Sequence, residues 1–144
     1  MDRKTWLSIL AKADTAELSA LWDALALAPA FSWLRRPQIG AVMVQGRAGG
    51  TGAAFNLGEM TVTRCTLQLE NGPVGVGYVQ GRDAAKAEIA ALADALLQTA
   101  AAQAILDGLI EPLRAKAQAR KAGRAAKADA TRVDFFTLVR GEDG

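Results

Sequence analysis

The sequence has no histidine and only one cysteine, Cys65, among its 144 residues. Without histidine, the chain can build neither a His-based catalytic triad nor a His-ligated metal site. One cysteine cannot hold an iron–sulfur cluster or a Cys-rich zinc site, and it cannot form a disulfide within the chain. These absences exclude several classes of enzyme and fit a reducing compartment.

Strong net charge and long apolar runs are also missing. The formal net charge is +2, so the chain as a whole lacks the basic balance of a nucleic-acid-binding protein. No apolar run reaches the roughly 18 residues that a membrane-spanning helix needs, and the first residues lack the apolar core of a signal peptide. We therefore expect a cytoplasmic protein that binds neither nucleic acid nor membrane.

Alanine is what the sequence has in abundance, at 31 of its 144 positions. Alanine favours helices, and its small side chain lets them pack closely. Large apolar side chains are correspondingly fewer than the hydrophobic fraction of 51% suggests. The hydrophobic core should be thin, and burial against partner subunits would help to stabilise it.

The N-terminal region has the pattern of two short helices. Asp14 and Glu17 have the spacing of a capping box, with Asp in place of the usual Ser or Thr. Apolar residues then recur on one helical face: Leu18, Leu21, Trp22 and Leu25. This helix should end before Pro29. Trp6 and Leu10 suggest a shorter helix before it.

The middle of the sequence has the texture of β-structure. Asn71-Gly72 is a strong hairpin signal, because both residues tolerate a positive φ. Four strands are predicted, over residues 31–33, 39–44, 60–69 and 74–80. Residues 45–52 should be a flexible connection between two of them. Gly75 and Gly77 point to the same side of their strand, which leaves room for a close backbone, a ligand or a helix.

Helical patterns return after the predicted sheet. Asp83 is placed to cap a helix whose apolar face lies opposite Asp94 and Gln98. A second helical stretch follows, and Pro112 should break or restart it. Overall we expect one α+β domain over residues 1–144, with an antiparallel meander between N-terminal helices and a helical excursion that ends in a C-terminal strand. The expected boundaries are helices over about 1–28, β-structure over 31–80, helices over 83–128 and the strand over 133–139.

A glycine-rich segment and three arginines are candidates for binding phosphate. Gly49-Gly50-Thr51-Gly52 offers backbone amides, but no Lys-Ser or Lys-Thr follows, so it is not a P-loop. Arg47, Arg64 and Arg82 carry the planar donor forks that suit phosphate or phosphonate oxygens. The alternatives are a flexible inter-strand loop and ordinary surface salt bridges. Neither catalytic residues nor a metal site can be identified, because no two carboxylates have a diagnostic spacing.

The segment over residues 113–128 is basic and rich in alanine. Four cations share one broad helical face: Lys116, Arg120, Arg124 and Lys127. The simplest interpretation is a solvated helix that rests on its alanine stripe, and a partner or polyphosphate site is the alternative. Aromatic residues do not interleave with the cations, which argues against single-stranded nucleic acid.

Several motifs, taken together, resemble one family. The C-terminal run from Arg132 to Gly141 (RVDFFTLVRG) resembles the ending of the PhnG family, the G subunit of the carbon–phosphorus lyase core complex. Further motifs follow in that family's order: Gly49-Gly50-Thr51-Gly52, Phe55, Gly58-Glu59, Thr63-Arg64 and Gly77 to Asp83. The resemblance covers roughly residues 3 to 141, and the cluster is specific where any single motif would be weak.

The resemblance implies a place in phosphonate breakdown. Such proteins assemble with the H, I and J subunits of the same system. The assembly displaces adenine from the ribose of ATP with a phosphonate, which gives an α-D-ribose 1-phosphonate 5-triphosphate. A later radical step, with S-adenosylmethionine and an iron–sulfur cluster, cleaves the carbon–phosphorus bond. Mg-ATP would be a substrate of the assembly, and we expect no cofactor on this chain alone.

The chain's own residues limit its share in that pathway. A lone Cys65 cannot hold the cluster of the radical step, and no nucleosidase constellation is visible, so the displacement is expected on the I subunit. The expected role is to shape that active site, as a subunit of a transferase complex that is not catalytic alone. A purely structural scaffold and an autonomous anion-binding module remain alternatives. Candidate partner-binding residues lie in the C-terminal run: Arg132, Asp134, Phe135, Phe136 and Arg140.

Overall fold

The structure is a computed structural model that describes residues 1–47, 52 and 54–143, without the side chains of residues 47, 54, 56 and 129–143. The chain divides into two compact units, Met1–Leu113 and Arg114–Gly144. The first unit, here called the core unit, contains a hydrophobic core, and the second continues a single helix. Within the described residues the architecture is α+β, as the sequence predicted.

Two short helices open the core unit, α1 (Arg3–Lys12) and α2 (Thr15–Leu25). Asp14 caps α2 as predicted, because its carboxylate accepts a hydrogen bond of 3.1 Å from the backbone N–H of Glu17. Asp2 caps α1 in the same way through Thr5. Each helix buries one apolar pair toward the core, Trp6 with Leu10 and Leu18 with Trp22.

A three-stranded antiparallel sheet follows, in the order β1–β2–β3. Its strands are β1 (Phe31–Arg47), β2 (Ala54–Leu69) and β3 (Val74–Gln80). The meander and the Asn71-Gly72 turn are confirmed, and Asn71 has the positive φ of 53° that the turn requires. The two strands predicted over 31–33 and 39–44 are one long strand, in which register shifts on either side of Arg35 accommodate Pro37.

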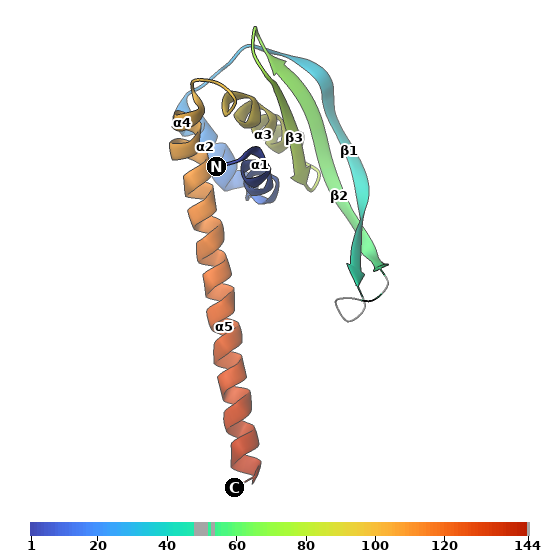
Figure 1. Ribbon diagram of the computed structural model, residues 1–144, viewed down its shortest axis with the longest axis vertical. Helices are drawn as coiled ribbons and strands as arrows, with labels where there is room; N and C mark the ends of the chain where they lie inside the picture. Colours follow the sequence, from blue (N-terminus) through green and yellow to red (C-terminus); the bar gives the residue numbers. More distant parts are fainter. Residues whose placement is uncertain (48–51, 53, 144) are drawn as a thin grey trace. The chain divides into compact units, whose positions relative to one another are not determined.

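Helix α3 (Ala84–Leu96) lies on one face of the sheet and is capped by Asp83, as predicted. Figure 1 shows α1, α2 and α3 on the same side of the strands. The contact between α3 and β3 is close, since a Cβ on Gly75 or Gly77 would overlap the carbonyl oxygen of Ala91 or Ala87. The two glycines therefore admit a neighbouring helix, one of the three predicted possibilities.

Asp94 was expected on the exposed side of its helix, and this prediction is wrong. Its side chain has 0% exposure. Because α3 is built largely from alanine and meets strands on one side and α1 on another, most of its circumference is buried. A helix with small side chains on every face is not confined to one apolar stripe, so the position of Asp94 could not be inferred from periodicity.

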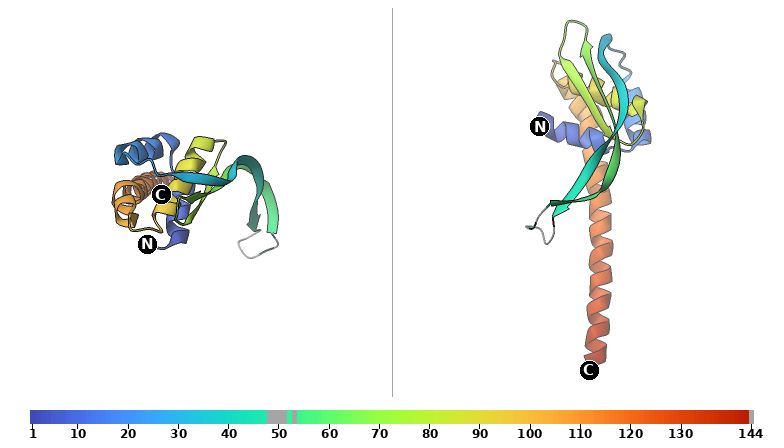
Figure 2. Two further views of the ribbon diagram at one scale, coloured as in Figure 1. Left: turned by 90° about the horizontal axis from the view of Figure 1, so that it is seen from above. Right: turned by 90° about the vertical axis from the view of Figure 1, so that its right-hand side faces the viewer.

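The chain then forms a short helix α4 (Ala102–Ile105), a π-helical turn (Leu106–Ile110) and the helix α5 (Glu111–Asp143). Pro112 lies in the first turn of α5, directly after the π-helical turn, and the helical backbone continues through it, so the predicted break or restart is wrong. The backbone N–H of Glu111 donates to Leu106. Figure 2 shows these elements in two further views.

The predicted C-terminal strand over residues 133–139 is wrong, because the structure places this segment inside α5. A strand must share its backbone hydrogen bonds with a neighbour, whereas a helix satisfies them within the segment. The alanine-rich sequence before residue 129 favours helix, and α5 continues from it through this region without a break. The local strand propensity of Val, Phe and Thr is overridden in this context.

The second unit contains most of the basic, alanine-rich segment. Residues 115–128 are exposed throughout, so the alanine stripe and the basic face are both accessible to solvent. The helical conformation of this segment is confirmed. The expected contact of the alanine side stays a prediction.

Candidate functional site

The face of the sheet away from the helices carries a row of polar and aromatic residues. Gln38, Arg64 and Tyr78 stand side by side across β1, β2 and β3 in the strand register. Tyr78 is 43% exposed and Arg64 is exposed as well. On β3 the residues of this face alternate with Gly75, Gly77 and Val79, which are buried beneath the helices. We call these three residues the open-face row.

The chemistry of this row is recognition of a flat or anionic group. A guanidinium offers a planar set of donors for phosphate oxygens, and a phenol ring offers an apolar face with a hydroxyl at its tip. Within the described residues, Arg64 makes neither a hydrogen bond nor an ion pair, so its donors face solvent. The row has no group suited to transfer a proton at neutral pH, so it can bind and orient but not act as general base.

Arg82 lies on a loop that is anchored to the same part of β2. The hydroxyl of Thr63 donates to the carbonyl of Gly81 over 2.7 Å and accepts from the backbone N–H of Asp83 over 3.0 Å. Gly81 has the positive φ of 91° that lets the chain leave β3 at this point. These two hydrogen bonds to Thr63 hold the backbone on either side of Arg82. Thr63 directly precedes Arg64 on β2, and the side chain of Arg82 is exposed.

Arg47 does not join Arg64 and Arg82. It ends β1 and pairs with Ala54, whereas Arg64 pairs with Gln38 nine residues earlier on β1. At a rise of about 3.3 Å per residue, nine residues correspond to roughly 30 Å along the strand. The three arginines are therefore not one site. Of the glycine-rich candidates, Gly52 forms a bend, and Gly49, Gly50 and Thr51 lie outside the described residues.

Two acidic side chains of the core unit, Asp83 and Asp94, have structural partners. Asp83 caps α3 and accepts 2.9 Å hydrogen bonds from the N–H of Lys86 and the hydroxyl of Thr15. Asp94 accepts from both Arg3 nitrogens at 2.8 and 3.1 Å, and from Trp6 Nε1 and the N–H of Val76 at 2.8 Å each. These hydrogen bonds link α1, α3 and β3, so the role of the Asp94 carboxylate is structural.

Two further buried groups could be mistaken for reactive ones. Burial raises the pKa of the Cys65 thiol to about 11, and its Sγ donates to the carbonyl of Ala87 over 3.3 Å. Burial lowers the pKa of Lys86, although Asp83 and Asp14 act in the opposite direction. Its Nζ donates to the carbonyl of Ala11 over 3.4 Å. A protonated, buried thiol is a poor nucleophile, so Cys65 is a packing residue.

Other site classes find no support in the described part of the chain. Among those residues, no three His, Cys, Asp or Glu side chains are grouped so that they could hold a metal ion. No described helix is both long enough and apolar enough to cross a membrane. The partner-binding candidates Arg132, Asp134, Phe135, Phe136 and Arg140 lie on α5, and their side chains are not among those described.

The sequence pattern missed Tyr78, Gln38 and Asp94. Tyr78 and Gln38 become candidates only once the register places them beside Arg64. A signal for Asp94 was available, since a single carboxylate stood among eight small or apolar neighbours, residues 89–93 and 95–97, in a predicted helix. A buried charge in such a setting needs partners, and Arg3 and Trp6 are 91 and 88 residues away in sequence.

Known proteins complete this description. A family model described as phosphonate metabolism protein PhnG matches residues 1–141. The chain belongs to the PhnG family. It is 47% identical over 141 residues to the alpha-D-ribose 1-methylphosphonate 5-triphosphate synthase subunit PhnG of Rhizobium meliloti (strain 1021). The aligned residues cover 98% of this chain and 90% of that protein. The family predicted from the clustered motifs is therefore confirmed, and with it a place in phosphonate metabolism.

Proposed function

We propose that this PhnG chain is a subunit of an assembly that transfers a phosphonate to the ribose of ATP. In that reaction a phosphonate oxygen forms a bond to ribose C1′, the N-glycosidic bond breaks and adenine leaves. The product is α-D-ribose 1-methylphosphonate 5-triphosphate when the substrate is methylphosphonate. The observation that carries the proposal is the 47% identity over 98% of the chain to a subunit of the corresponding synthase.

The chain's part in the reaction is to hold and orient, while another subunit performs the displacement. The described residues offer no histidine and no group of three side chains that could hold a metal ion. What they offer is the open-face row and the anchored Arg82 loop. Positioning reactants can contribute much of a rate acceleration without any covalent step on the positioning protein.

The partners of this proposal are the H, I and J subunits, with the displacement on the I subunit. Mg-ATP and the phosphonate are substrates of the whole assembly, with no cofactor bound by this chain alone. We assign Arg64 and Arg82 to the binding of substrate phosphates, because both have exposed guanidinium groups. Thr63, which directly precedes Arg64, forms hydrogen bonds to both sequence neighbours of Arg82.

The experiment is co-expression with the H, I and J subunits, followed by size determination and an assay for adenine release from ATP and methylphosphonate. The isolated chain should release no adenine, and its addition to the I subunit should shift simple hydrolysis toward phosphonate transfer. Phosphonate-dependent turnover by the isolated chain would contradict the proposal.

Substitutions separate a positioning subunit from a scaffold. In the intact assembly, Arg64→Ala and Arg82→Ala should each raise the apparent KM for ATP by about tenfold or more, because each removes a charged donor. Arg36→Ala is the matched control, since Arg36 is also an exposed arginine of the sheet but lies on β1 outside the open-face row. If all three variants assemble and show unchanged kinetics, the chain is a scaffold.

A further inference from the structure

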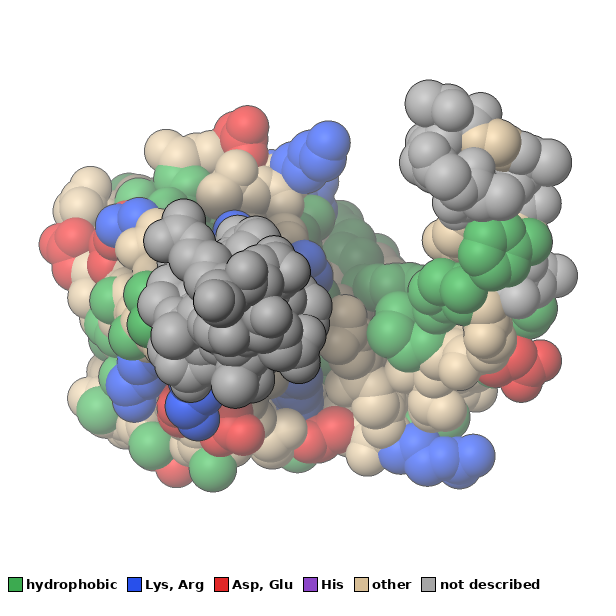
Figure 3. All heavy atoms as spheres, turned by 90° about the horizontal axis from the view of Figure 1, so that it is seen from below, with side chains coloured by type: hydrophobic (Ala, Val, Ile, Leu, Met, Phe, Trp, Pro, Cys, Tyr) green, Lys and Arg blue, Asp and Glu red, His purple; other side chains and the backbone are tan. Residues whose placement is uncertain are grey.

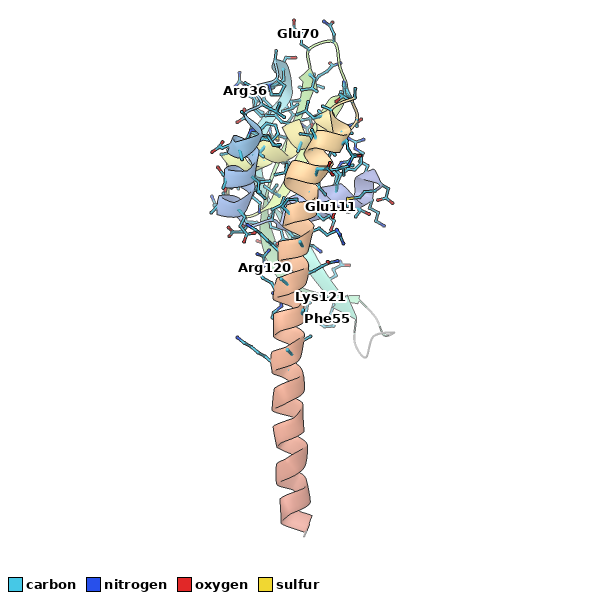
Figure 4. The ribbon with its side chains drawn as sticks, turned by 90° about the vertical axis from the view of Figure 1, so that its left-hand side faces the viewer. Arg36, Phe55, Glu70, Glu111, Arg120 and Lys121 are labelled. Atoms are coloured by element: carbon cyan, nitrogen blue, oxygen red, sulfur yellow. The ribbon has the colours of Figure 1, made fainter. Side chains whose placement is uncertain are left out.

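The three strands of the sheet have very different lengths. β1 has 17 residues and β2 has 16, but β3 has only 7. β3 pairs with β2 from Val62 to Gln68, so residues 41–47 of β1 and 54–61 of β2 pair only with each other. We call this two-stranded ribbon the arm. Figure 2 shows it extending past α1, α2 and α3, and Figure 4 places Phe55 on it, far from Glu70 at the opposite end of the sheet.

The arm exposes large apolar side chains. Leu57 is 62% exposed, Met43 is 50%, Phe55 is 47% and Val44 is 36%. Phe55 and Leu57 lie together above Gly46, since a Cβ on Gly46 would be 3.3 Å from the Phe55 ring and 3.1 Å from a Leu57 methyl group. Hydrophobic side chains gather on the arm in Figure 3, to the right of the view. An isolated two-stranded ribbon with this composition is marginal in water unless something covers it.

We call the rest of the sheet the base, which comprises residues 31–40 of β1, residues 62–69 of β2, and β3. The outer edge of β1 is protected against strand pairing at the base but not in the arm. At the base, the outer edge of β1 carries Arg35, Arg36 and Pro37, and its register shifts twice around them. Charges, proline and irregular register are the usual means by which a protein prevents pairing at a sheet edge. The arm has neither lysine nor proline, and its charged residues are Arg47 and Glu59 alone. Both of its edges are open over most of their length.

The chemistry of the arm selects the kind of partner. One cation and one anion leave it without net charge, which disfavours nucleic acid and an anionic lipid surface. Exposed Phe, Leu and Met beside open strand edges suit a protein that offers an apolar, uncharged groove and a strand to pair with. The relative from Rhizobium meliloti is named as a synthase subunit, so a different polypeptide is a suitable occupant.

We propose that the arm is the element by which this chain docks on another subunit of the synthase assembly. The occupant is a different polypeptide with an apolar, near-neutral groove, and it covers Phe55 and Leu57 while it extends the sheet at an arm edge. This proposal rests on the proposed function, because it takes its partner from the same assembly. It goes further by assigning the contact surface and its chemistry.

Two arm variants and one matched control test the proposal. Leu57→Ser removes an apolar contact, and Met43→Lys adds the edge charge that the arm lacks. Leu34→Ser is the control, because Leu34 is 57% exposed on the same sheet but lies at the protected base of β1. All three substitutions are on the surface, so each variant should melt within a few degrees of the unchanged chain, which melting curves will establish.

The measurement is the affinity of each chain for the co-expressed H, I and J subunits. The unchanged chain and Leu34→Ser should bind alike, and Leu57→Ser and Met43→Lys should each bind at least about tenfold more weakly. Equal binding by all four chains overturns the docking proposal and leaves the proposed function intact. Failure of the unchanged chain to bind overturns the proposed function and the docking proposal with it.

A second copy of the chain is the competing occupant. It is tested by sedimentation of the isolated chain over a range of concentrations. If the unchanged chain forms a dimer that Leu57→Ser disrupts, while binding to the other subunits is unaffected, the arm is a self-association surface and the proposal is overturned. If the isolated chain stays monomeric and the arm variants fail only in the assembly, the proposal is supported.

Discussion

The base and the arm of the sheet belong to the same two strands but are stabilised in opposite ways. At the base, β3 and α3 are so close that glycine is the only residue that fits at positions 75 and 77. There the core includes Cys65, Leu67 and Val79, each at most 1% exposed. In the arm, Phe55 and Leu57 are roughly half exposed or more. The chain itself buries the apolar side chains of the base, whereas those of the arm are exposed on its surface.

This difference separates residues that maintain the fold from residues that serve assembly. Substitutions at the base should change the free energy of unfolding whether or not partners are present. Substitutions in the arm should change binding and leave the isolated chain's stability nearly unaltered. The following predictions test that division, from the largest expected effect to the smallest.

Asp94→Ala should have the largest effect on stability. It removes the acceptor for Arg3, Trp6 Nε1 and the N–H of Val76, and leaves two of these donors buried without a partner. We expect a loss of about 3–5 kcal/mol in the free energy of unfolding, measured by chemical denaturation. Arg3→Ala should cost less, because the Arg3 side chain is 46% exposed and the other donors to Asp94 remain. Equal losses would contradict the role given to Asp94.

Gly75→Ala should also weaken the base. The added Cβ would overlap the carbonyl oxygen of Ala91 and lie 2.8 Å from the Ala95 methyl group, so α3 must move away from the sheet. Overpacking of this kind costs about 1–3 kcal/mol. The control is Gly40→Ala on β1, where a Cβ has no neighbour within 4 Å and should have little effect. Denaturation of both variants measures the difference, and equal stability would show that the sheet–helix contact is looser than described.

The Cys65 thiol reports on the base through its pH dependence. Its pKa is raised from the ordinary 9.0 to about 11 by burial, so at pH 8 the folded chain should hold roughly 100-fold less thiolate than the unfolded chain. Because the folded pKa is the higher one, this contribution to stability is complete below pH 9 and is lost as pH rises through about 11. Alkylation by iodoacetamide with and without denaturant measures it. Equal rates in both states would mean that the thiol is not buried.

Leu57→Ser should have the smallest effect on stability. The side chain is 62% exposed, so its removal should change the free energy of unfolding of the isolated chain by no more than about 0.5 kcal/mol. A loss of 2 kcal/mol or more in thermal or chemical unfolding would mean that the arm is part of the folding unit, and the comparison between base and arm would fail.

Local signals in the sequence predicted the elements of the base well. The Asp14 and Asp83 caps, the Asn71-Gly72 turn and the bounds of β3 depend on residues within a few positions of one another. Such features follow from backbone chemistry that a short segment determines by itself. Gly75 and Gly77 were recognised as a bare strand face, although the sequence could not say which of three neighbours would occupy it.

Features that depend on distant contacts were not predicted. The burial of Asp94 depends on Arg3 and Trp6, and periodicity within α3 carries no information about either. The length of the arm was missed because residues 45–52 were interpreted as a flexible connection and the next strand was expected only from residue 60, whereas β1 continues to Arg47 and β2 begins at Ala54. The helix over residues 133–139 was missed because the strand propensity of Val, Phe and Thr is local, whereas a strand also needs a neighbouring strand for its backbone hydrogen bonds.

The candidate phosphate-binding residues stay a prediction, and the structure shows only where they lie. Arg64 and Arg82 were selected by residue type. In the structure, Thr63, next to Arg64, forms hydrogen bonds to the backbone of Gly81 and Asp83 on either side of Arg82. Arg47 was selected on the same grounds, but it lies at the far end of β1 and belongs to the arm. Residue type suggests which groups can bind phosphate, whereas the strand register decides which of them can act together.

Hydrogen–deuterium exchange tests the division between base and arm most directly. The backbone amides of residues 41–47 and 54–61 should exchange quickly in the isolated chain and become strongly protected when the H, I and J subunits are bound. The amides of β3 and α3 should be protected in both states, because their cover belongs to the same chain. Protection that appears elsewhere on binding, with no change in the arm, would contradict the account.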